Sequence, residues 1–213
     1  RLTNISFFKY GWCFGFGYFL CSLYWIIISL TFDQNFYFLI PFAVILIPSF
    51  LALFYGLVTY LFSIFYSKKI INSILIFSLF FGLIEFIRGS ILTGFPWNLI
   101  SFSFSNSIYF IQIISIIGTY SFNLICITLF TLPAVFVLKK SKKNIVFVSG
   151  FILVTVSFVI FGIYQIKEFN VLPSLKKTYS IKAISSNISL DRFYIEKNEK
   201  EIINELIDLS APE

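Results

Sequence analysis

Residues that could do chemistry gather where an apolar segment ends: Glu85 and Arg88 are followed by the turn Gly94-Phe95-Pro96-Trp97. Bilayer hydrocarbon costs a lone ionised side chain about 2.5–3.5 kcal/mol, so such residues are usually functional or paired. Glu85 and Arg88 are three positions apart and can share one helix face. One interpretation is a structural charge pair that holds the following loop. The other is a site in which the five donors of Arg88 meet an anionic lipid headgroup or a reacting centre.

Trp97 also allows two interpretations. It could belong to the belt of aromatic side chains at the membrane–water interface. Alternatively, because it directly follows Pro96 in a loop too apolar for water, it could form a rigid wall of a lipid-binding cleft. Gln112 and Asn123 lie inside apolar stretches, and we interpret them as hydrogen-bond donors between helices.

The residue types exclude several other chemistries. The sequence has no His, which excludes His-based triads, His metal ligands and His proton relays from this chain. Its cysteines lie in apolar runs without a Cys-x-x-Cys spacing, so we expect no metal site and only small packing residues at Cys13, Cys21 and Cys126. Gly11 and Gly15, with Gly17 beyond them, predict close helix packing rather than nucleotide binding.

The elements that must position these residues are membrane helices. The chain is 58% hydrophobic and 12% charged, with a mean hydropathy of +0.91, which predicts a polytopic α-helical membrane protein. Five spans are predicted, at about 7–32, 37–66, 70–87, 119–138 and 144–166. The loop near 89–107 is apolar enough to lie in the interface, and 108–117 could be a half-helix that Gly118 ends.

Charge placement predicts the topology. With five spans, the basic residues Arg1, Lys9, Lys68, Lys69 and 139–143 fall on one side, which the positive-inside rule makes cytoplasmic. The interfacial loop and everything after about residue 166 then lie outside the cytoplasm. The net charge of +6 is thus a topology signal and not a sign of nucleic-acid binding.

The composition changes after the last predicted span, which gives domain boundaries of 1–166 and 167–213. Alternation over 179–183 predicts a strand, and the apolar positions of 195–209 predict an amphipathic helix, so we expect the beginning of an α/β domain. Glu213 is interpreted as a helix-terminal residue rather than a catalytic carboxylate. The chain has no Met and is interpreted as an internal fragment of a longer protein.

Three stretches resemble one family, the apolipoprotein N-acyltransferases of bacterial inner membranes. Residues 11–17, Gly-Trp-Cys-Phe-Gly-Phe-Gly, resemble an early span of that family. Residues 85–99, from Glu85-Phe86-Ile87-Arg88-Gly89 to Pro96-Trp97-Asn98-Leu99, are similar to its most recognisable membrane motif. Residues 184–188, Ile-Ser-Ser-Asn-Ile, resemble the opening strand and loop of its nitrilase-like (carbon-nitrogen hydrolase) domain, an αββα sandwich.

The resemblance implies an enzyme that moves an acyl chain from a phospholipid to the N-terminal diacylglyceryl-cysteine of apolipoproteins through a Cys thioester, with no cofactor or metal. Its Glu-Lys-Cys triad is expected beyond Glu213, so this chain alone is expected to be inactive. The residues after about 166 would begin the periplasmic domain. The expected contribution of this chain is the lining of the cleft that lipid and lipoprotein enter: Arg88, Gly94, Phe95, Pro96 and Trp97.

Two other function classes remain open from the sequence. A transporter would also place ionisable residues and broken helices within the membrane, and flux in proteoliposomes would reveal it. A non-catalytic membrane scaffold with an extracytoplasmic domain is the other. The polar residues collect at one membrane face, which favours interfacial lipid chemistry over transport.

Overall fold

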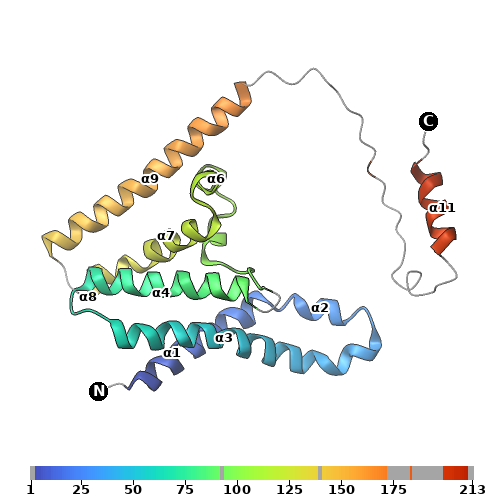
Figure 1. Ribbon diagram of the computed structural model, residues 1–213, viewed down its shortest axis with the longest axis horizontal. Coiled ribbons are helices and arrows are strands. Elements are labelled where there is room, and N and C mark those ends of the chain that lie inside the picture. The colour runs from blue at the N-terminus through green and yellow to red at the C-terminus, as the bar shows by residue number, and fades with distance from the viewer. Residues whose placement is uncertain (1–2, 92–93, 139–140, 172–182, 184–198, 211–213) are drawn as a thin grey trace. The chain divides into compact units, whose positions relative to one another are not determined.

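The computed structural model describes residues 3–91, 94–138, 141–171, 183 and 199–210 (Figure 1). The chain divides into two compact units, Arg1–Val171 and Leu172–Glu213. Within the described residues, all regular structure is helical. The helices of the first unit are α1 (Asn4–Ser22), α2 (Ile26–Leu30), η1 (Gln34–Leu39), α3 (Ile40–Phe65), α4 (Ile70–Ser90), η2 (Ile100–Phe104), α5 (Ile108–Ile111), α6 (Ile114–Ile117), α7 (Thr119–Thr131), α8 (Pro133–Leu138) and α9 (Lys142–Val171).

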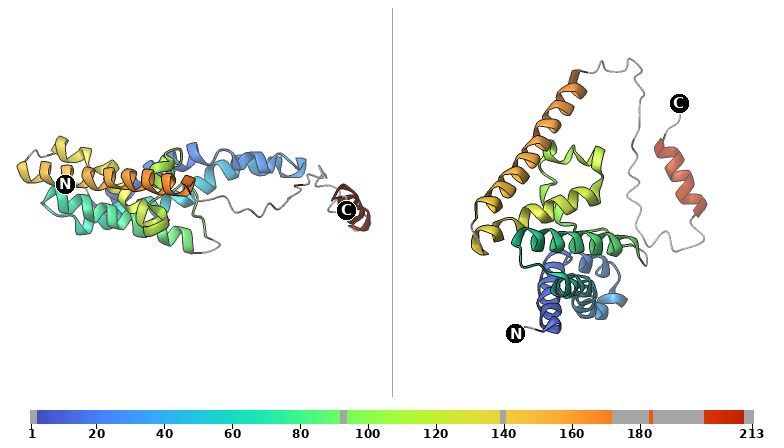
Figure 2. Two further views of the ribbon diagram at one scale, coloured as in Figure 1. Left: turned by 90° about the horizontal axis from the view of Figure 1, so that it is seen from above. Right: turned by 60° about the vertical axis from the view of Figure 1, so that its left-hand side comes forward.

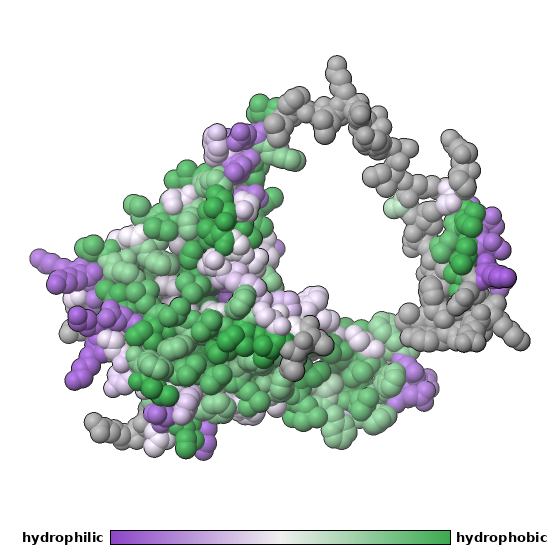
Figure 3. Space-filling model, viewed as in Figure 1, coloured by the Kyte–Doolittle hydropathy of each residue, from purple (hydrophilic) through white to green (hydrophobic). Residues whose placement is uncertain are grey.

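Four helical stretches are long and apolar enough to cross a membrane in the part of the chain that the structure describes: Gln34–Phe65, Ile70–Ser90, Thr119–Leu138 and Lys142–Val171. They coincide with four of the five predicted spans. Their outward sides are apolar, and apolar side chains cover most of the visible face of the first unit (Figure 3). Helices that are apolar all round are expected where lipid, not water, surrounds the bundle.

The predicted first span, 7–32, is wrong as one continuous helix. α1 ends at Ser22, a turn follows, and α2 begins at Ile26. The residues at this break make contacts with distant parts of the chain, which the length of the apolar run cannot predict. Ser22 is the hydrogen-bond partner of Asn98 in a distant loop, and Leu23 is buried in the core.

α1 packs against α3 (Figure 2), and Gly11 and Gly15 lie at this contact, as the small-xxx-small pattern predicts. A Cβ atom at Gly15 would lie 2.9 Å from the Cβ of Tyr55, and one at Gly11 would collide with Thr59. Nothing lies within 4 Å of the corresponding position at Gly17. Of these three glycines of α1, only Gly11 and Gly15 therefore let the two helices approach closely.

α4 contacts both α3 and α7 and so occupies the centre of the site region. The main core cluster joins these helices with α1, through residues that include Phe19, Leu51, Tyr55, Phe81 and Ile127. α4 continues to Ser90, three residues beyond the predicted end of its span, so Arg88 lies in its last turn. The predicted half-helix 108–117 is confirmed as α5 and α6, which end at Gly118 with φ +77°.

The second unit is described mainly through α11 (Glu199–Ser210), which accounts for most of the predicted amphipathic helix. Ile202 on its apolar face is 5% exposed. The predicted strand 179–183, apart from Ala183, lies outside the described residues, as do the loop 185–189 and Glu213. The expected nitrilase-like domain is therefore left as a prediction.

Candidate functional site at the end of α4

The centre of the candidate site is the pair Glu85 and Arg88 in the last two turns of α4. Their side chains share one helix face and point into the bundle, where they are 0% and 1% exposed. Arg88 Nη2 lies 3.7 Å from Glu85 Oε1, so the predicted charge pair is present as a buried contact. Buried charges of this kind persist only where other groups hydrogen-bond them.

Glu85 receives hydrogen bonds from both neighbouring helices. The Tyr55 hydroxyl of α3 donates to Oε1 over 3.0 Å, and Asn123 Nδ2 of α7 donates to Oε2. The carboxylate thus joins α3, α4 and α7 at one point. Asn123 confirms the prediction of a hydrogen bond between helices, whereas Gln112 donates to Ile108 O on its own short segment, so that prediction was wrong.

Arg88 holds the loop that follows α4. Its Nη1 donates to the carbonyl oxygens of Phe95, over 2.7 Å, and Trp97, over 3.1 Å. The Phe95 amide donates back to Arg88 O over 3.2 Å, and the guanidinium lies 5.3 Å from the centre of the Phe19 ring. Hydrogen bonds from a charged donor are the stronger kind, so the backbone of 95–97 is fixed to the end of α4.

The next part of the loop is held by α1 and α7. Tyr18 of α1 donates to Asn98 O over 2.9 Å, and Asn98 Nδ2 donates to Ser22 Oγ over 2.7 Å. Asn123 Oδ1 accepts from the Ser101 amide over 2.9 Å. Sequence reasoning missed Tyr18, Ser22 and Asn98, because polar residues of these types are common at span ends and nothing in their spacing singles them out.

Two glycines let the loop turn back onto α4. Gly94 has φ +72°, a region that residues with a Cβ rarely adopt, and a Cβ there would lie 2.7 Å from Gly89 O. A Cβ at Gly89 would collide with the Tyr120 hydroxyl. The backbones of Gly89 and Gly94 therefore lie close together, which joins the Glu-x-x-Arg-Gly segment to the Gly-Phe-Pro-Trp segment.

Trp97 is held by its backbone, while its ring points outward and is 55% exposed. The ring lies beside that of Trp25, with centroids 5.8 Å apart. Trp25 comes from the turn that divides the predicted first span. The pair forms an exposed aromatic surface between the turn after α1 and the loop after α4.

A groove of about 340 Å³ lies beside Arg88. One wall is α3, through Leu46, Ile47, Phe50, Leu51 and Phe54. The other is formed by Arg88, Ile91, Gly94 and Phe95. Three of the five residues predicted to line a cleft therefore meet in this groove, whereas Pro96 and Trp97 are exposed and are not part of its lining.

Other reactive groups are scarce in the part of the chain that the structure describes. It contains no cluster of three or more His, Cys, Asp or Glu side chains that could hold a metal ion. Cys126 is buried, as a packing residue should be, but Cys13 and Cys21 are exposed, so the packing prediction was wrong for those two. The site thus offers hydrogen-bond donors, one cation and apolar walls, which suit binding of an amphiphile.

Comparison with known proteins places the region that contains this site in a family. The sequence model described as the apolipoprotein N-acyltransferase N-terminal domain matches residues 1–132. The chain is 39% identical to the apolipoprotein N-acyltransferase of Rickettsia prowazekii over 160 residues, which are 74% of this chain and 32% of the relative. It is 36% identical to the enzyme of that name from Rhizobium etli over 138 residues, 64% of this chain and 26% of the relative.

A third relative extends the similarity along nearly the whole chain. Identity to the apolipoprotein N-acyltransferase of Agrobacterium fabrum is 28% over 205 residues, 96% of this chain and 38% of the relative. The chain thus spans about a third of the length of these relatives. No solved structure matches the chain significantly.

Proposed function

The chain belongs to the apolipoprotein N-acyltransferase family, and we propose that it forms membrane helices of an enzyme that completes lipoprotein maturation. In this proposal a phospholipid donates an acyl chain to the α-amino group of an N-terminal diacylglyceryl-cysteine. A nucleophilic Cys forms a thioester, releasing the lysophospholipid, and the amine then attacks the thioester and frees the thiol. The Glu-Lys-Cys triad for these steps is expected beyond Glu213.

The proposed role of this chain is to form the membrane-side wall of the substrate cleft. Arg88, Gly94 and Phe95 would line it from the groove beside α3, and Pro96 and Trp97 from the outer surface of the loop. The observation that carries the proposal is the buried network, because it fixes the backbone of 95–98 through side chains of two helices, α4 and α1, and leaves the Trp97 ring exposed to contact a ligand. Sites held on rigid elements in this way are suited to precise binding.

The proposed setting is the bacterial inner membrane. The basic ends of the helices would face the cytoplasm, α1 and α2 would complete a fifth crossing, and the interfacial loop would face the periplasm. Residues after about 166 would begin a periplasmic nitrilase-like domain. The family match supports this arrangement over the transporter and scaffold interpretations.

Substituting Trp97 in the complete protein that contains this chain tests the proposal. We expect Trp97→Ala to lower acyl transfer from a phospholipid to a diacylglyceryl peptide, at unchanged membrane level, because an exposed ring that contacts substrate would be lost. Trp12→Phe is the matched control, since Trp12 packs on Phe16 of its own helix and donates to Ser49 O away from the loop. Full transfer by Trp97→Ala would refute a role for this residue in the cleft.

A further inference from the structure

Lysine side chains gather at the end of the first unit where α4 and α9 begin (Figure 1). The exposed lysines there are Lys68, Lys69, Lys142 and Lys143. The two connections that carry them lie close together, because Ile70 at the start of α4 packs against the cluster that contains Val135 of α8 and Val148 of α9. Hydrophilic surface gathers at this side of the unit in Figure 3. These four side chains form the lysine end of the unit.

Hydrogen bonds fix the backbone of both connections. The amide of Lys69 donates to the Ser67 hydroxyl over 3.2 Å, and the amide of Ser67 donates to the Ser73 hydroxyl over 3.1 Å. At the start of α9, the amide of Asn144 donates to the Ser141 hydroxyl over 3.2 Å. The lysine side chains therefore project from defined positions on two neighbouring turns.

The carboxylates of the described first unit lie far from the lysine end. They are Asp33, Glu85 and Glu168. The stretch of α4 from Lys69 to Glu85 is about 24 Å long, and that of α9 from Lys143 to Glu168 is about 38 Å, at 1.5 Å per residue. Asp33 precedes η1 and so lies at the far end of α3. Since the Debye length is about 8 Å at physiological salt, these carboxylates leave the lysine charges uncompensated.

Apolar side chains border the lysines on the outer surface of the helices. Val137 and Leu138 at the end of α8 are 85% and 71% exposed, and Val146 near the start of α9 is 70% exposed. Both helices belong to candidate spans, so lipid chains rather than water surround these side chains. Lysine stems can lie along such a surface while their ammonium groups reach the headgroup layer. The surface thus complements a lipid with an anionic headgroup.

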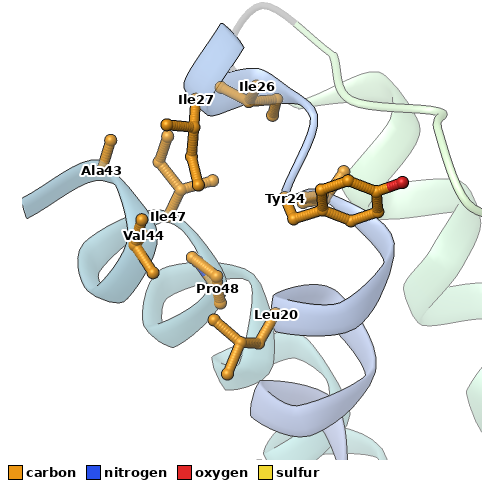
Figure 4. Close-up of a pocket in the computed structure, with 9 residues that line it drawn as sticks. Leu20, Tyr24, Ile26, Ile27, Ala43, Val44, Ile47 and Pro48 are labelled. Carbon is orange, nitrogen blue, oxygen red and sulfur yellow. The ribbon is translucent and has the colours of Figure 1, made fainter. Parts of the chain in front are cut away.

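The cavities beside α1 do not offer this combination. The cavity between α1, α2 and α3 is apolar and only about 30 Å³, room for a water or two (Figure 4). A groove of about 450 Å³ has a polar lining that includes Tyr18, Ser22 and Asn98, which already hydrogen-bond one another. Neither lining contains a charged residue. The lysine end is also at the opposite end of α4 from Glu85 and Arg88, so a ligand there lies outside the cleft proposed above.

We propose that the lysine end binds the headgroup of an anionic phospholipid, whose acyl chains lie along Val137, Leu138 and Val146. The N-termini of α4 and α9 point to this end and have no acidic residue in their first turns, so their dipoles add positive potential. Each lysine near an anionic lipid surface contributes about fivefold to binding. This proposal does not rest on the proposed function, because the lipid is held away from that cleft and gives up no acyl chain.

The test is native mass spectrometry of the complete protein that contains this chain, in mild detergent. It is titrated with dioleoylphosphatidylglycerol or with dioleoylphosphatidylcholine, which share their chains and differ in headgroup charge. Lys142→Gln and Lys167→Gln are matched variants, since each removes one exposed lysine from α9 but at opposite ends of the helix. Lys142→Arg keeps the charge and controls for the change of side chain.

We expect the wild-type protein to bind the phosphatidylglycerol at least tenfold more tightly than the phosphatidylcholine. Lys142→Gln should lose about fivefold of this preference, whereas Lys142→Arg and Lys167→Gln should keep it. Equal binding of the two lipids by the wild type, or equal preference in Lys142→Gln and Lys167→Gln, would overturn the proposal. Displacement of the lipid by inorganic phosphate, but not by sodium chloride at the same ionic strength, would show that the lysines recognise a free anion and would overturn the lipid assignment.

Discussion

Removing the guanidinium of Arg88 should destabilise the protein strongly. In Arg88→Ala, the carbonyl oxygens of Phe95 and Trp97 lose their donor, and Glu85 stays buried without its cation. Breaking a buried ion pair from one side costs about 3–5 kcal/mol. The two hydrogen bonds from a charged group give a similar sum, since each contributes about 1.5–3 kcal/mol. We therefore expect the free energy of unfolding to fall by about 4 kcal/mol.

The measurement is unfolding in mixed micelles of mild and denaturing detergent, followed by circular dichroism. Lys68→Ala is the control, because it removes an exposed cation from the connection between α3 and α4 and should change stability by less than about 0.5 kcal/mol. A loss below about 1 kcal/mol in Arg88→Ala would refute the argument, since it would mean that neither the loop carbonyls nor Glu85 depend on the guanidinium.

Substituting Glu85, the partner of Arg88, tests the geometry of the hydrogen bonds around its carboxylate. Glu85→Gln keeps the size of the side chain, and its amide oxygen can still accept from Tyr55. Its amide nitrogen then faces Asn123 Nδ2, so two donors meet. Rotating the Asn123 amide by 180° would move the conflict to the Ser101 amide, which now donates to Asn123 Oδ1. Turning the new amide so that its nitrogen donates to the Tyr55 hydroxyl oxygen keeps both hydrogen bonds, but it places that nitrogen beside Arg88 Nη2, which now lies 3.7 Å from Oε1. Because each arrangement loses either a hydrogen bond or the attraction to Arg88, Glu85→Gln should lower the free energy of unfolding in the same detergent titration.

Two glycines that are closely packed against a tyrosine, Gly89 against Tyr120 and Gly15 against Tyr55, yield further predictions. Gly89→Ala places a Cβ against the Tyr120 hydroxyl and should destabilise by about 1–3 kcal/mol in the same detergent titration. Tyr120→Phe in the same chain should recover part of that loss, and no recovery would contradict the proposed collision. Gly15→Val should separate α1 from α3 and lower the unfolding midpoint by overpacking against Tyr55, whereas Gly17→Val faces open space and should not; equal effects would refute the packing.

The sequence could predict the helices wherever apolar length alone decides them. Four spans were located within a few residues, because lipid imposes a length on any helix that crosses it. The broken first span was not predictable in this way. Its end depends on Ser22 and Leu23, whose partners are far along the chain, and local periodicity carries no information on such contacts.

The same limit applies to the candidate site. The cost of charge in an apolar segment marked Glu85 and Arg88 as either paired or functional, and their spacing indicated that they can share one helix face. Tyr55 could not be singled out, because one tyrosine on an apolar helix resembles any other until the fold brings it to Glu85. The groove was equally hidden, since its long wall consists of ordinary apolar residues of α3.

The hydrogen bonds that hold the loop explain how the buried charge pair of Glu85 and Arg88, although costly to bury, could serve a binding site. Arg88 and Tyr18 bind the carbonyl oxygens of Phe95, Trp97 and Asn98 rather than the side chains of Phe95 and Trp97. The loop backbone is therefore fixed while both aromatic side chains remain available, one beside the groove and one at the outer surface. An apolar pair in place of Glu85 and Arg88 could stabilise the bundle equally well. It could not donate to the carbonyl oxygens of Phe95 and Trp97, so this part of the loop would lose the side-chain donor that fixes it to the end of α4.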